Sequence, residues 1–272
     1  SWNTRDLLRD CLRSTIEAAS GLSFEIIVVD NASGDDSALM VRREFGAEPR
    51  VRLIANARND MFARGNNLAF AASRGSILLI INPDIVLNGA ALSGMIDHLR
   101  THPGAGIVAC NLVGADGVPQ TLHRAFPTLP IVFYVWTRLG RRLDRWLLFG
   151  LNGRRYRLQT RRRRGLVVVD QAAAACLAIR RSTVERIGGL FDERFPLFFN
   201  DVDLSRRVRD LGLEVHVRYD LSVTHHGGAS IRQLPDGERD LQRYEALARY
   251  YDVHQPPWKA RLVRRMVSRN RR

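Results

Sequence analysis

Cysteine is scarce in this sequence, and the three that occur, Cys11, Cys110 and Cys176, are far apart. No pair has the Cys-x-x-Cys spacing of a zinc or redox site, and an odd number argues against a disulfide framework. We therefore expect a protein of a reducing compartment. Long apolar runs are also missing: the longest candidate, residues 130–136, is far shorter than the ~18 residues of a spanning helix.

Acidic residues are almost absent from two arginine-rich stretches. Residues 138–164 contain eleven Arg and a single acid, and residues 257–272 contain one Lys and six Arg with no acid. These stretches carry net charges of +10 and +7, which leaves about −3 for the remainder of a chain whose net charge is +14. The pattern predicts a near-neutral globular body with two cationic appendages. Such surfaces bind phosphate groups, for example those of lipid head groups, nucleic acid or a polyanionic substrate.

Hydrophobic residues make up 45% of the 272 residues, enough for one large domain or two small ones with a sizeable core. Apolar runs alternate with amphipathic segments. We expect helices at 5–19, 37–45, 64–74, 90–101, 183–187 and 201–211, and strands at 24–29, 51–55, 76–81, 107–110, 166–169 and 214–217. This alternation predicts an α/β fold with a mainly parallel sheet covered by helices on both faces.

Two carboxylates follow strands of the predicted sheet, Asp30 after 24–29 and Asp84 after 76–81. Ligands of such folds bind beyond the carboxyl ends of the strands. Asp30 could accept hydrogen bonds from a base or a ribose hydroxyl, or could stabilise an Asx turn. Asp84 follows a proline that fixes the turn. A hard oxygen ligand there suits Mg²⁺ or Mn²⁺ bridging a diphosphate, although a simple strand-end turn is the alternative.

Asp201 and Asp203 stand at the start of a predicted helix, behind two phenylalanines. One of them could cap the helix, because its dipole favours acids at the N-terminus. The functional alternative makes Asp201 a base that deprotonates an acceptor hydroxyl. His225 and His226 precede two glycines and could bind a metal or a phosphate, or could be structural.

Arg64-Gly-Asn-Asn opens another predicted helix. It could present N–H groups and a guanidinium to an anion, or its asparagines could cap the helix.

The order of these segments is more informative than any one of them. Along the chain come Asp30, Arg64-Gly-Asn-Asn, Asn-Pro-Asp84, Gly-Gly-Leu-Phe-Asp-Glu at 188–193, Phe-Phe-Asn-Asp-Val-Asp-Leu at 198–204 and His-His-Gly-Gly at 225–228. The ordered set resembles family 2 glycosyltransferases of the GT-A fold, specifically their rhamnosyltransferase-like branch, over roughly residues 1–255.

This resemblance implies an inverting enzyme that uses a nucleotide-diphospho-sugar and a divalent cation, Mg²⁺ or Mn²⁺. It favours dTDP-rhamnose as donor, with UDP- and GDP-sugars open, and a lipid-linked or cell-surface polysaccharide acceptor. Asp201 corresponds to the general base. The other positions it implies are donor-binding Trp2, Asn3, Asp30, Asn31, Arg64, Asn67, Asn82 and Asp84; metal-binding Asp84, His225 and His226; and acceptor-side Asn200 and Asp203.

The sequence departs from the family pattern in four places. Asn82-Pro83-Asp84 offers one carboxylate, so metal binding could be weak or dispensable, and Asn200 replaces an acid that often precedes the base. Residues 170–176 lack the Trp and Ser-Gly usual there, which predicts an unusual acceptor pocket. The first strand of the fold is missing. It would lie between strands 24–29 and 76–81, so we expect a fragment of a longer protein with reduced stability.

The two basic stretches have the pattern of helices that lie in membrane interfaces. The insertion at about 130–164 would present Leu139, Leu143, Trp146 and Leu147, and the tail at 256–272 would present Trp258, Leu262, Met266 and Val267. We expect peripheral docking on the anionic cytoplasmic face of the cell membrane, with solvated surface helices as the alternative.

Two rival functions remain. A nucleic-acid-binding module is disfavoured because the arginine runs lack interleaved aromatics for base stacking, so we expect no nucleic acid partner. The second rival is a glycosyltransferase-like protein that binds without turnover.

Overall fold

The computed structural model describes residues 1–158 and 164–268. Residues 159–163 of the predicted insertion and 269–272 of the predicted tail lie outside the described residues. The helices are α1 (Arg5–Ala18), α2 (Ser37–Phe45), α3 (Met61–Ala72), α4 (Gly89–Thr101), α5 (Leu129–Ile131), η1 (Val132–Trp136), α6 (Arg138–Leu147), α7 (Leu151–Tyr156), α8 (Arg181–Arg186), α9 (Asn200–Asp210), η2 (Ile231–Gln233), α10 (Asp236–His254) and α11 (Pro257–Ser268). The strands are β1 (Ile26–Asp30), β2 (Val51–Ala55), β3 (Ile77–Ile81), β4 (Ile85–Val86), β5 (Ala105–Val113), β6 (Leu166–Val169), β7 (Cys176–Arg180) and β8 (Glu214–His225).

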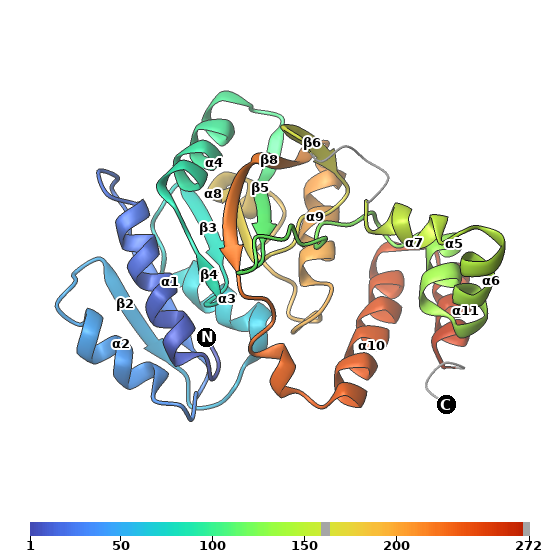
Figure 1. Ribbon diagram of the computed structural model, residues 1–272, viewed down its shortest axis with the longest axis horizontal. Coiled ribbons are helices and arrows are strands. Elements are labelled where there is room, and N and C mark those ends of the chain that lie inside the picture. The colour runs from blue at the N-terminus through green and yellow to red at the C-terminus, as the bar shows by residue number, and fades with distance from the viewer. Residues whose placement is uncertain (159–163, 269–272) are drawn as a thin grey trace.

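The strands form two sheets (Figure 1). β1 and β2 make a parallel pair, and the larger sheet has the order β3-β7-β5-β8-β4 with β6 also on β8. In the larger sheet β5 and β8 pair in parallel, whereas β3–β7, β5–β7, β4–β8 and β6–β8 are antiparallel. The predicted α/β class is confirmed, with more antiparallel pairing than the sequence led us to expect, because β7 enters between β3 and β5 from the opposite end.

Helices cover both faces of the larger sheet, as predicted. Side chains of β5 and β7 alternate between two cores, since successive residues of a strand point to opposite faces. Ile107 and Leu177 pack in the core that includes residues of α3, α8 and α9. Val108 and Cys176 pack in the core that includes residues of α4. The sheet is thus a rigid platform on which the loops at the strand ends are held.

A third core forms a helical lobe, which we define as η1, α5–α7, α10 and α11. Apolar residues of η1, α10 and α11 pack there with Phe195, Phe199 and Val202, at and before the start of α9. Figure 1 places this lobe at the far end of the molecule from β1 and β2. The start of α9 therefore lies at the junction of body and lobe.

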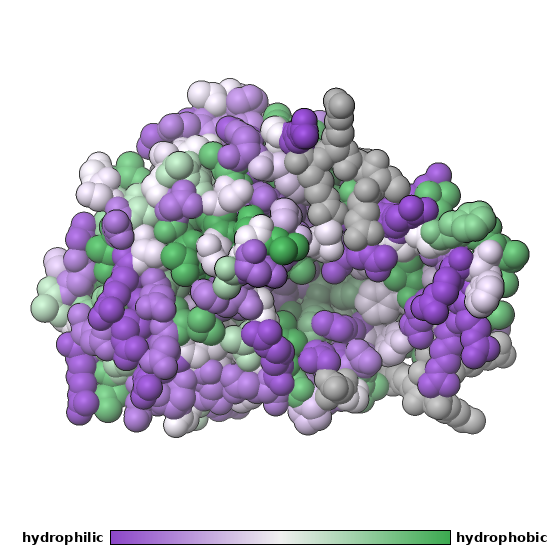
Figure 2. Space-filling view, viewed as in Figure 1, coloured by the Kyte–Doolittle hydropathy of each residue, from purple (hydrophilic) through white to green (hydrophobic). Residues whose placement is uncertain are grey.

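The two predicted membrane-binding surfaces, in α6 and α11, differ in how much of their apolar side chains the helical lobe buries. In α6 and just after it, Leu139, Trp146, Leu147 and Phe149 are exposed, and Figure 2 shows apolar side chains reaching the surface at that end among polar ones. In α11, Val263 and Val267 are buried in the lobe core and Met266 packs against it, whereas Trp258 and Leu262 of the predicted tail face are exposed. Among the described residues, no helix has the length and apolarity to span a membrane.

A slot separates the two sheets. In the part of the chain that is described, β1 pairs only with β2 and β3 only with β7, so each leaves an edge unpaired. Cavities of about 240 and 590 Å³ lie between these edges, with residues of both strands, α1 and α3 in their walls. The slot lies where a further strand is expected, between the strands predicted at 24–29 and 76–81; that a strand fills it stays a prediction.

The first residue already has the geometry of a strand at one end of this slot. The Ser1 amino group donates to the Val29 carbonyl at 2.7 Å, and the Asn31 N–H donates to the Ser1 carbonyl at 2.9 Å. These two bonds are those of a parallel bridge between Ser1 and Asp30. Burial lowers the pKa of the Ser1 amino group, although Asp30 opposes the shift.

Candidate active site

Asp84 and His225 meet where β4 pairs with β8. Asp84 directly precedes β4, whose first residue Ile85 is paired with His225. Both side chains are about 5% exposed, and His225 Nε2 lies 3.5 Å from Asp84 Oδ1. The register of one short antiparallel ladder thus brings together two groups that are more than 100 residues apart.

Gln120 fixes which nitrogen of His225 carries a proton. The Gln120 amide donates from Nε2 to the His225 carbonyl at 2.8 Å, so its Oε1 is the atom that faces His225 Nδ1 at 2.6 Å. Oε1 can only accept, and Nδ1 must therefore donate. In the neutral ring Nε2 then keeps its lone pair toward Asp84, the arrangement found when a second partner orients a metal-binding histidine.

Three buried polar atoms at this point have no hydrogen-bond partner among the described residues: Asn82 Oδ1, Asp84 Oδ1 and His225 Nε2. Buried polar atoms are normally satisfied, so a group of such atoms indicates a missing ligand. Burial alone would raise the pKa of Asp84, but His225, in the form whose ring is protonated, and the Ala229 N–H hold that pKa below its ordinary value. Two oxygens and an imidazole nitrogen suit a small divalent cation.

No group of three His, Cys, Asp or Glu side chains is clustered for a metal in the described structure. The residues at this point therefore fit a cation that also takes oxygens from a bound substrate or water. The predicted partner His226 is exposed, and its backbone N–H, at 2.9 Å from the Asp84 carbonyl, is what holds the site together.

The loop after His226 closes over the first residues of the chain. Ser230 Oγ donates to the Trp2 carbonyl at 2.9 Å, and Gln233 Nε2 donates to the Asn3 carbonyl at 2.9 Å. Trp2, Asn31, Asn82 and Asp84 all line the smaller cavity at the end of the slot. Four of the predicted donor-binding residues are therefore brought to one cavity.

Other predicted donor residues are engaged in holding loops. Asp30 accepts from Ser33 N at 3.0 Å and from Ser33 Oγ at 2.6 Å. These bonds hold the loop as the structural alternative expects, but they reach three residues along the chain, one more than an Asx turn. Asn3 accepts from Gly34 N at 2.8 Å. Asn31 accepts from Asn56 Nδ2 at 2.9 Å.

The Arg64-Gly-Asn-Asn segment lies inside α3, which begins three residues earlier than predicted. Asn67 exchanges hydrogen bonds of 2.9 and 3.0 Å with the backbone of Phe191, so it anchors the 188–193 segment. Arg64 is partly exposed and lies 3.5 Å from Asp60. The structure thus brings Asn67 to a structural contact and leaves Arg64 on the surface.

Asp201 stands in the first turn of α9, with its Oδ1 accepting from Val202 N at 2.9 Å. Asp201 as a whole residue is half-buried. Burial raises the pKa of Asp201, against the opposing influence of the Val202 N–H and the Arg124 guanidinium. A carboxylate whose pKa is raised toward neutrality is a better proton acceptor than an exposed one.

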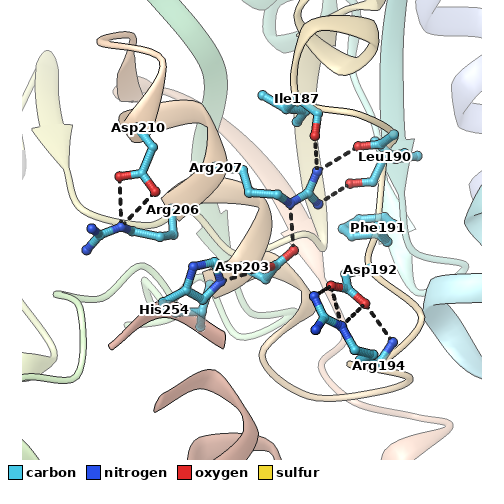
Figure 3. A network of polar contacts seen from close by, with 12 residues as sticks. Ile187, Leu190, Phe191, Asp192, Arg194, Asp203, Arg206, Arg207, Asp210 and His254 are labelled. Carbon is cyan, nitrogen blue, oxygen red and sulfur yellow. Dashed lines mark hydrogen bonds and ion pairs between the residues drawn. The ribbon is translucent and has the colours of Figure 1, made fainter. Parts of the chain in front are cut away.

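Asp203 has a different role from the one that the resemblance implies. Its side chain is 1% exposed, and its oxygens accept from His254 Nε2 at 2.8 Å and Arg207 Nε at 2.8 Å (Figure 3). Arg207 also donates to the carbonyls of Gly189 and Leu190. Asp203 therefore fastens α9 to α10 and the 188–193 segment and does not face an acceptor. Asn200 is also buried and donates to the Leu197 carbonyl at 2.9 Å.

Breaking this network is expected to cost stability. Arg207→Met leaves the buried Asp203 carboxylate without its arginine and should lower the free energy of unfolding by roughly 3–5 kcal/mol, since one partner of a buried pair is removed. Urea unfolding measures it. The neighbouring Arg206→Met is the matched control: its pair with Asp210 is partly exposed and should contribute about 1 kcal/mol or less. Equal losses in the two variants would contradict the anchoring role.

Sequence reasoning missed Gln120 and Arg124. Gln120 follows a turn in which Val113 and Pro119 bridge, and only the observed pairing of β4 and β8 places it beside His225. Arg124 lies in an irregular segment, where no hydrophobic periodicity predicts which way its side chain points.

The sequence matches the family model described as Glycosyl transferase family 2 over residues 1–187. It is 32% identical over 233 residues to the uncharacterized protein y4gI of Sinorhizobium fredii, covering 84% of this chain and 24% of that protein. It is 26% identical over 245 residues to the O-antigen biosynthesis protein RfbC of Myxococcus xanthus, covering 84% of this chain and 17% of that protein. The chain thus spans a quarter or less of the length of these two relatives.

A relative of more similar length is the N-acetylglucosaminyl-diphospho-decaprenol L-rhamnosyltransferase of Mycobacterium tuberculosis. It is 24% identical over 267 residues, which cover 92% of this chain and 81% of that protein.

Among solved structures, the mannosyltransferase PcManGT from Pyrobaculum calidifontis, in complex with GDP-Man and Mn²⁺, superposes with a TM-score of 0.60 at 17% identity. This match covers 97% of this chain and 66% of that one. Glucosyl-3-phosphoglycerate synthase from Mycobacterium tuberculosis, in complex with Mn²⁺, UDP and glucosyl-3-phosphoglycerate, gives a TM-score of 0.57 at 16% identity, over 93% of this chain and 76% of that one. The fold predicted from the sequence is thereby confirmed.

Proposed function

The chain belongs to glycosyl transferase family 2 and is a glycosyltransferase, and we propose that it transfers rhamnose from dTDP-rhamnose, with inversion, to a hydroxyl of a lipid-linked or polysaccharide acceptor. One observation carries the proposal: Asn82 and Asp84, each with a partnerless buried oxygen, line the cavity that Trp2 and Asn31 also line, and the partnerless Nε2 of His225 lies 3.5 Å from Asp84. The Mycobacterium tuberculosis rhamnosyltransferase supports the choice of sugar.

Asp84 and His225 are the residues that would hold Mg²⁺ or Mn²⁺, with Asn82 beside them. When bound, such an ion offsets the negative charge of the departing nucleoside diphosphate. Two solved structures of the same fold contain Mn²⁺ with GDP-Man or UDP, which supports a divalent cation here. Gln120 keeps the His225 ring in the orientation and tautomer that binding requires.

Asp201 acts as the base. Its carboxylate accepts the proton of the acceptor hydroxyl as that oxygen forms a bond to the anomeric carbon of the donor and the bond to the diphosphate breaks. Attack from the face opposite the leaving group inverts the anomeric centre. Asp203, through His254 and Arg207, keeps the α9 helix that carries Asp201 in position.

The remaining donor-side proposals concern the nucleoside. Trp2 lines the cavity, and its ring can cover a base. Asn3, Asp30 and Asn31 shape the adjoining loop through the bonds to Gly34, Ser33 and Asn56. Arg64, which is half exposed, and Asn67 complete the predicted donor set from α3.

A transfer assay tests the proposed reaction. The purified chain is incubated with Mn²⁺, dTDP-rhamnose and an N-acetylglucosaminyl-diphospho-lipid of short chain length, with UDP-glucose, UDP-galactose and GDP-mannose as alternative donors. We expect a rhamnosylated product whose anomeric configuration, read by NMR, is opposite to that of the donor. Retention of the donor's anomeric configuration would contradict the mechanism. If only another donor supports transfer, the sugar of that donor replaces rhamnose in the proposal.

We place the enzyme at the inner face of the cell membrane, held by the α6 surface, which we define as Leu139, Trp146, Leu147 and Phe149 with the arginines around them. These four side chains are 61–81% exposed. Around them stand Arg138, Arg141, Arg142 and Arg145. Aromatic and leucine side chains beside arginines suit the interface of an anionic membrane.

Vesicle flotation checks this location. The chain should float with vesicles that contain anionic lipid, and the Trp146→Ala/Phe149→Ala double variant should be recruited roughly tenfold less, because two apolar side chains no longer enter the interface. Val118→Ala removes another exposed apolar side chain, far from α6 in sequence, and should float like the parent chain. Equal recruitment of the parent and the double variant would exclude the α6 surface.

A further inference from the structure

Arginines from two separate segments gather near the base Asp201. Arg124 lies in the segment between β5 and α5, and Arg239 and Arg243 lie on α10. Arg124 is held over the Tyr156 ring, 5.4 Å from its centroid, and Arg243 over the Phe198 ring at 5.0 Å. Such stacking fixes a guanidinium while leaving its N–H donors in the ring plane available for an anion.

The charges of these groups act on one another. Partial burial lowers the pKa of Arg243 even though Asp240 opposes the shift, and the neighbouring Arg239 and Arg124 lower it further. Burial raises the pKa of Tyr156 to about 12, while Arg124 and Arg243 act in the opposite direction. The charge of Arg124 also opposes the rise in the pKa of Asp201 that burial causes. Arg124, Arg243, Tyr156 and Asp201 therefore share one electrostatic environment.

Neither Arg124 nor Arg243 is closely paired with an acid of the part of the chain that the structure describes. In the described residues, no carboxylate lies within 4.0 Å of Arg124, and the Arg243–Asp240 pair is 3.7 Å apart with both side chains exposed. An exposed pair of that length contributes little. Like charges that converge at a cleft favour an anionic ligand, and arginine forks match the oxygens of phosphate.

This cluster is separate from the place where the donor diphosphate is expected. Asp84 and His225 belong to the β4–β8 end of the body, whereas Arg239 and Arg243 stand on α10 and Tyr156 ends α7, both in the helical lobe (Figure 1). Figure 2 shows the surface hollowed between body and lobe on this face. Asp201 is in the first turn of α9, at the junction of body and lobe.

We propose that Arg124 and Arg243, with Arg239 beside them, bind a diphosphate of the acceptor while Asp201 receives the proton of its sugar hydroxyl. This inference rests on the proposed function and narrows its acceptor to one that carries a diphosphate. A lipid-linked diphosphate and a free diphosphate offer the same chemistry to the arginines. The helical lobe that carries the cluster also carries the α6 surface, which favours the lipid-linked source.

Calorimetry with the full chain tests the proposal, with Mn²⁺ and a saturating concentration of the nucleoside diphosphate that occupies the donor site. The probes are geranyl diphosphate, inorganic pyrophosphate and geraniol. Geranyl diphosphate should bind and geraniol should not. Arg124→Gln and Arg243→Gln should each weaken geranyl diphosphate binding by roughly ten- to a hundredfold, the value of a charged hydrogen bond, with unchanged nucleotide affinity.

The matched control is Arg100→Gln, which removes the same charge from an exposed position on α4 and should change nothing. If pyrophosphate binds as tightly as geranyl diphosphate, the arginines recognise a diphosphate from either source. If pyrophosphate binds more weakly than geranyl diphosphate, they recognise the lipid-linked source. Unchanged geranyl diphosphate affinity in both variants would overturn the proposal, as would a parallel loss of nucleotide affinity. A parent chain that binds geranyl diphosphate but no nucleotide would instead contradict the proposed function.

Discussion

Asp201→Asn is expected to reduce sugar transfer by about 10²–10⁴-fold, the usual contribution of a general base, with donor affinity unchanged. The amide has nearly the same shape and can still accept from the Val202 N–H, but it cannot take the proton of the acceptor hydroxyl. Initial rates and donor titrations of the same sample measure the two quantities. Asp210→Asn changes an exposed carboxylate at the other end of α9 and should keep full activity.

Ionisation of Asp201 gives the stability of the parent chain a pH dependence of definite sign. Because burial raises the pKa of Asp201 above its ordinary value of 3.8, the native state binds a proton more tightly than the unfolded chain. Stability therefore falls as the pH rises from 3.8 through the folded pKa, and the ionised carboxylate costs stability at neutral pH. Asp201→Asn should melt at the same temperature as the parent chain or higher. Full activity, or a loss matched by weaker donor binding, would remove the assignment of Asp201 as base.

Filling the slot between β1 and β3 is expected to raise the melting temperature by about 10 °C. Since Ser1 bridges Asp30, four residues placed before Ser1 would lie opposite Ile26–Val29. Four β-branched residues would bury apolar side chains in the part of the slot that Ile26–Val29 and β3 line, and would satisfy the free edges of both strands. The end of the slot at Trp2, Asn82 and Asp84 would stay open for the donor. A gain of several kcal/mol corresponds to a shift of this size in a domain of this length.

Circular dichroism melting compares the parent chain with this extended version. An extension of the same length made of Gly and Ser is the control, because it cannot fill an apolar slot and should leave the melting temperature nearly unchanged. The extension also replaces the buried Ser1 amino group by a peptide N–H that keeps the bond to the Val29 carbonyl. Identical melting of the two extended chains would show that the slot does not accept a strand.

The hydrophobic periodicity of the sequence and the order of its segments predicted much of the fold. The strands at 24–29, 51–55, 76–81 and 166–169 and their neighbouring helices were found within a few residues, because buried strands read as continuous apolar runs. β7 was missed since its Cys-Leu-Ala-Ile-Arg sequence follows four alanines, which have no strand signal. β8 was predicted as 214–217 but continues to His225, because polar residues interrupt its apolar pattern.

The candidate site was harder to predict, for reasons visible in particular residues. Asp201 and Asp203 looked alike in the sequence, yet residues two apart on a helix point in nearly opposite directions, so Asp203 is buried against His254 and Arg207 while Asp201 is only half-buried. The apolar stripe of residues 257–268 could serve a membrane or a core, and the structure divides it: Val263 and Val267 pack in the lobe core, whereas Trp258 and Leu262 stay exposed. Gln120 and Arg124 act through contacts with segments far away in the chain, which no local pattern encodes.

Calorimetric titration of dTDP-rhamnose, UDP-glucose, UDP-galactose and GDP-mannose, with and without Mn²⁺, measures whether Asp84 and His225 form a donor site. We expect one donor, dTDP-rhamnose, to bind selectively, with Mn²⁺ increasing its affinity in the parent chain and not in Asp84→Asn. Absence of donor binding by a cooperatively folded sample, in the presence and absence of Mn²⁺, would contradict the account.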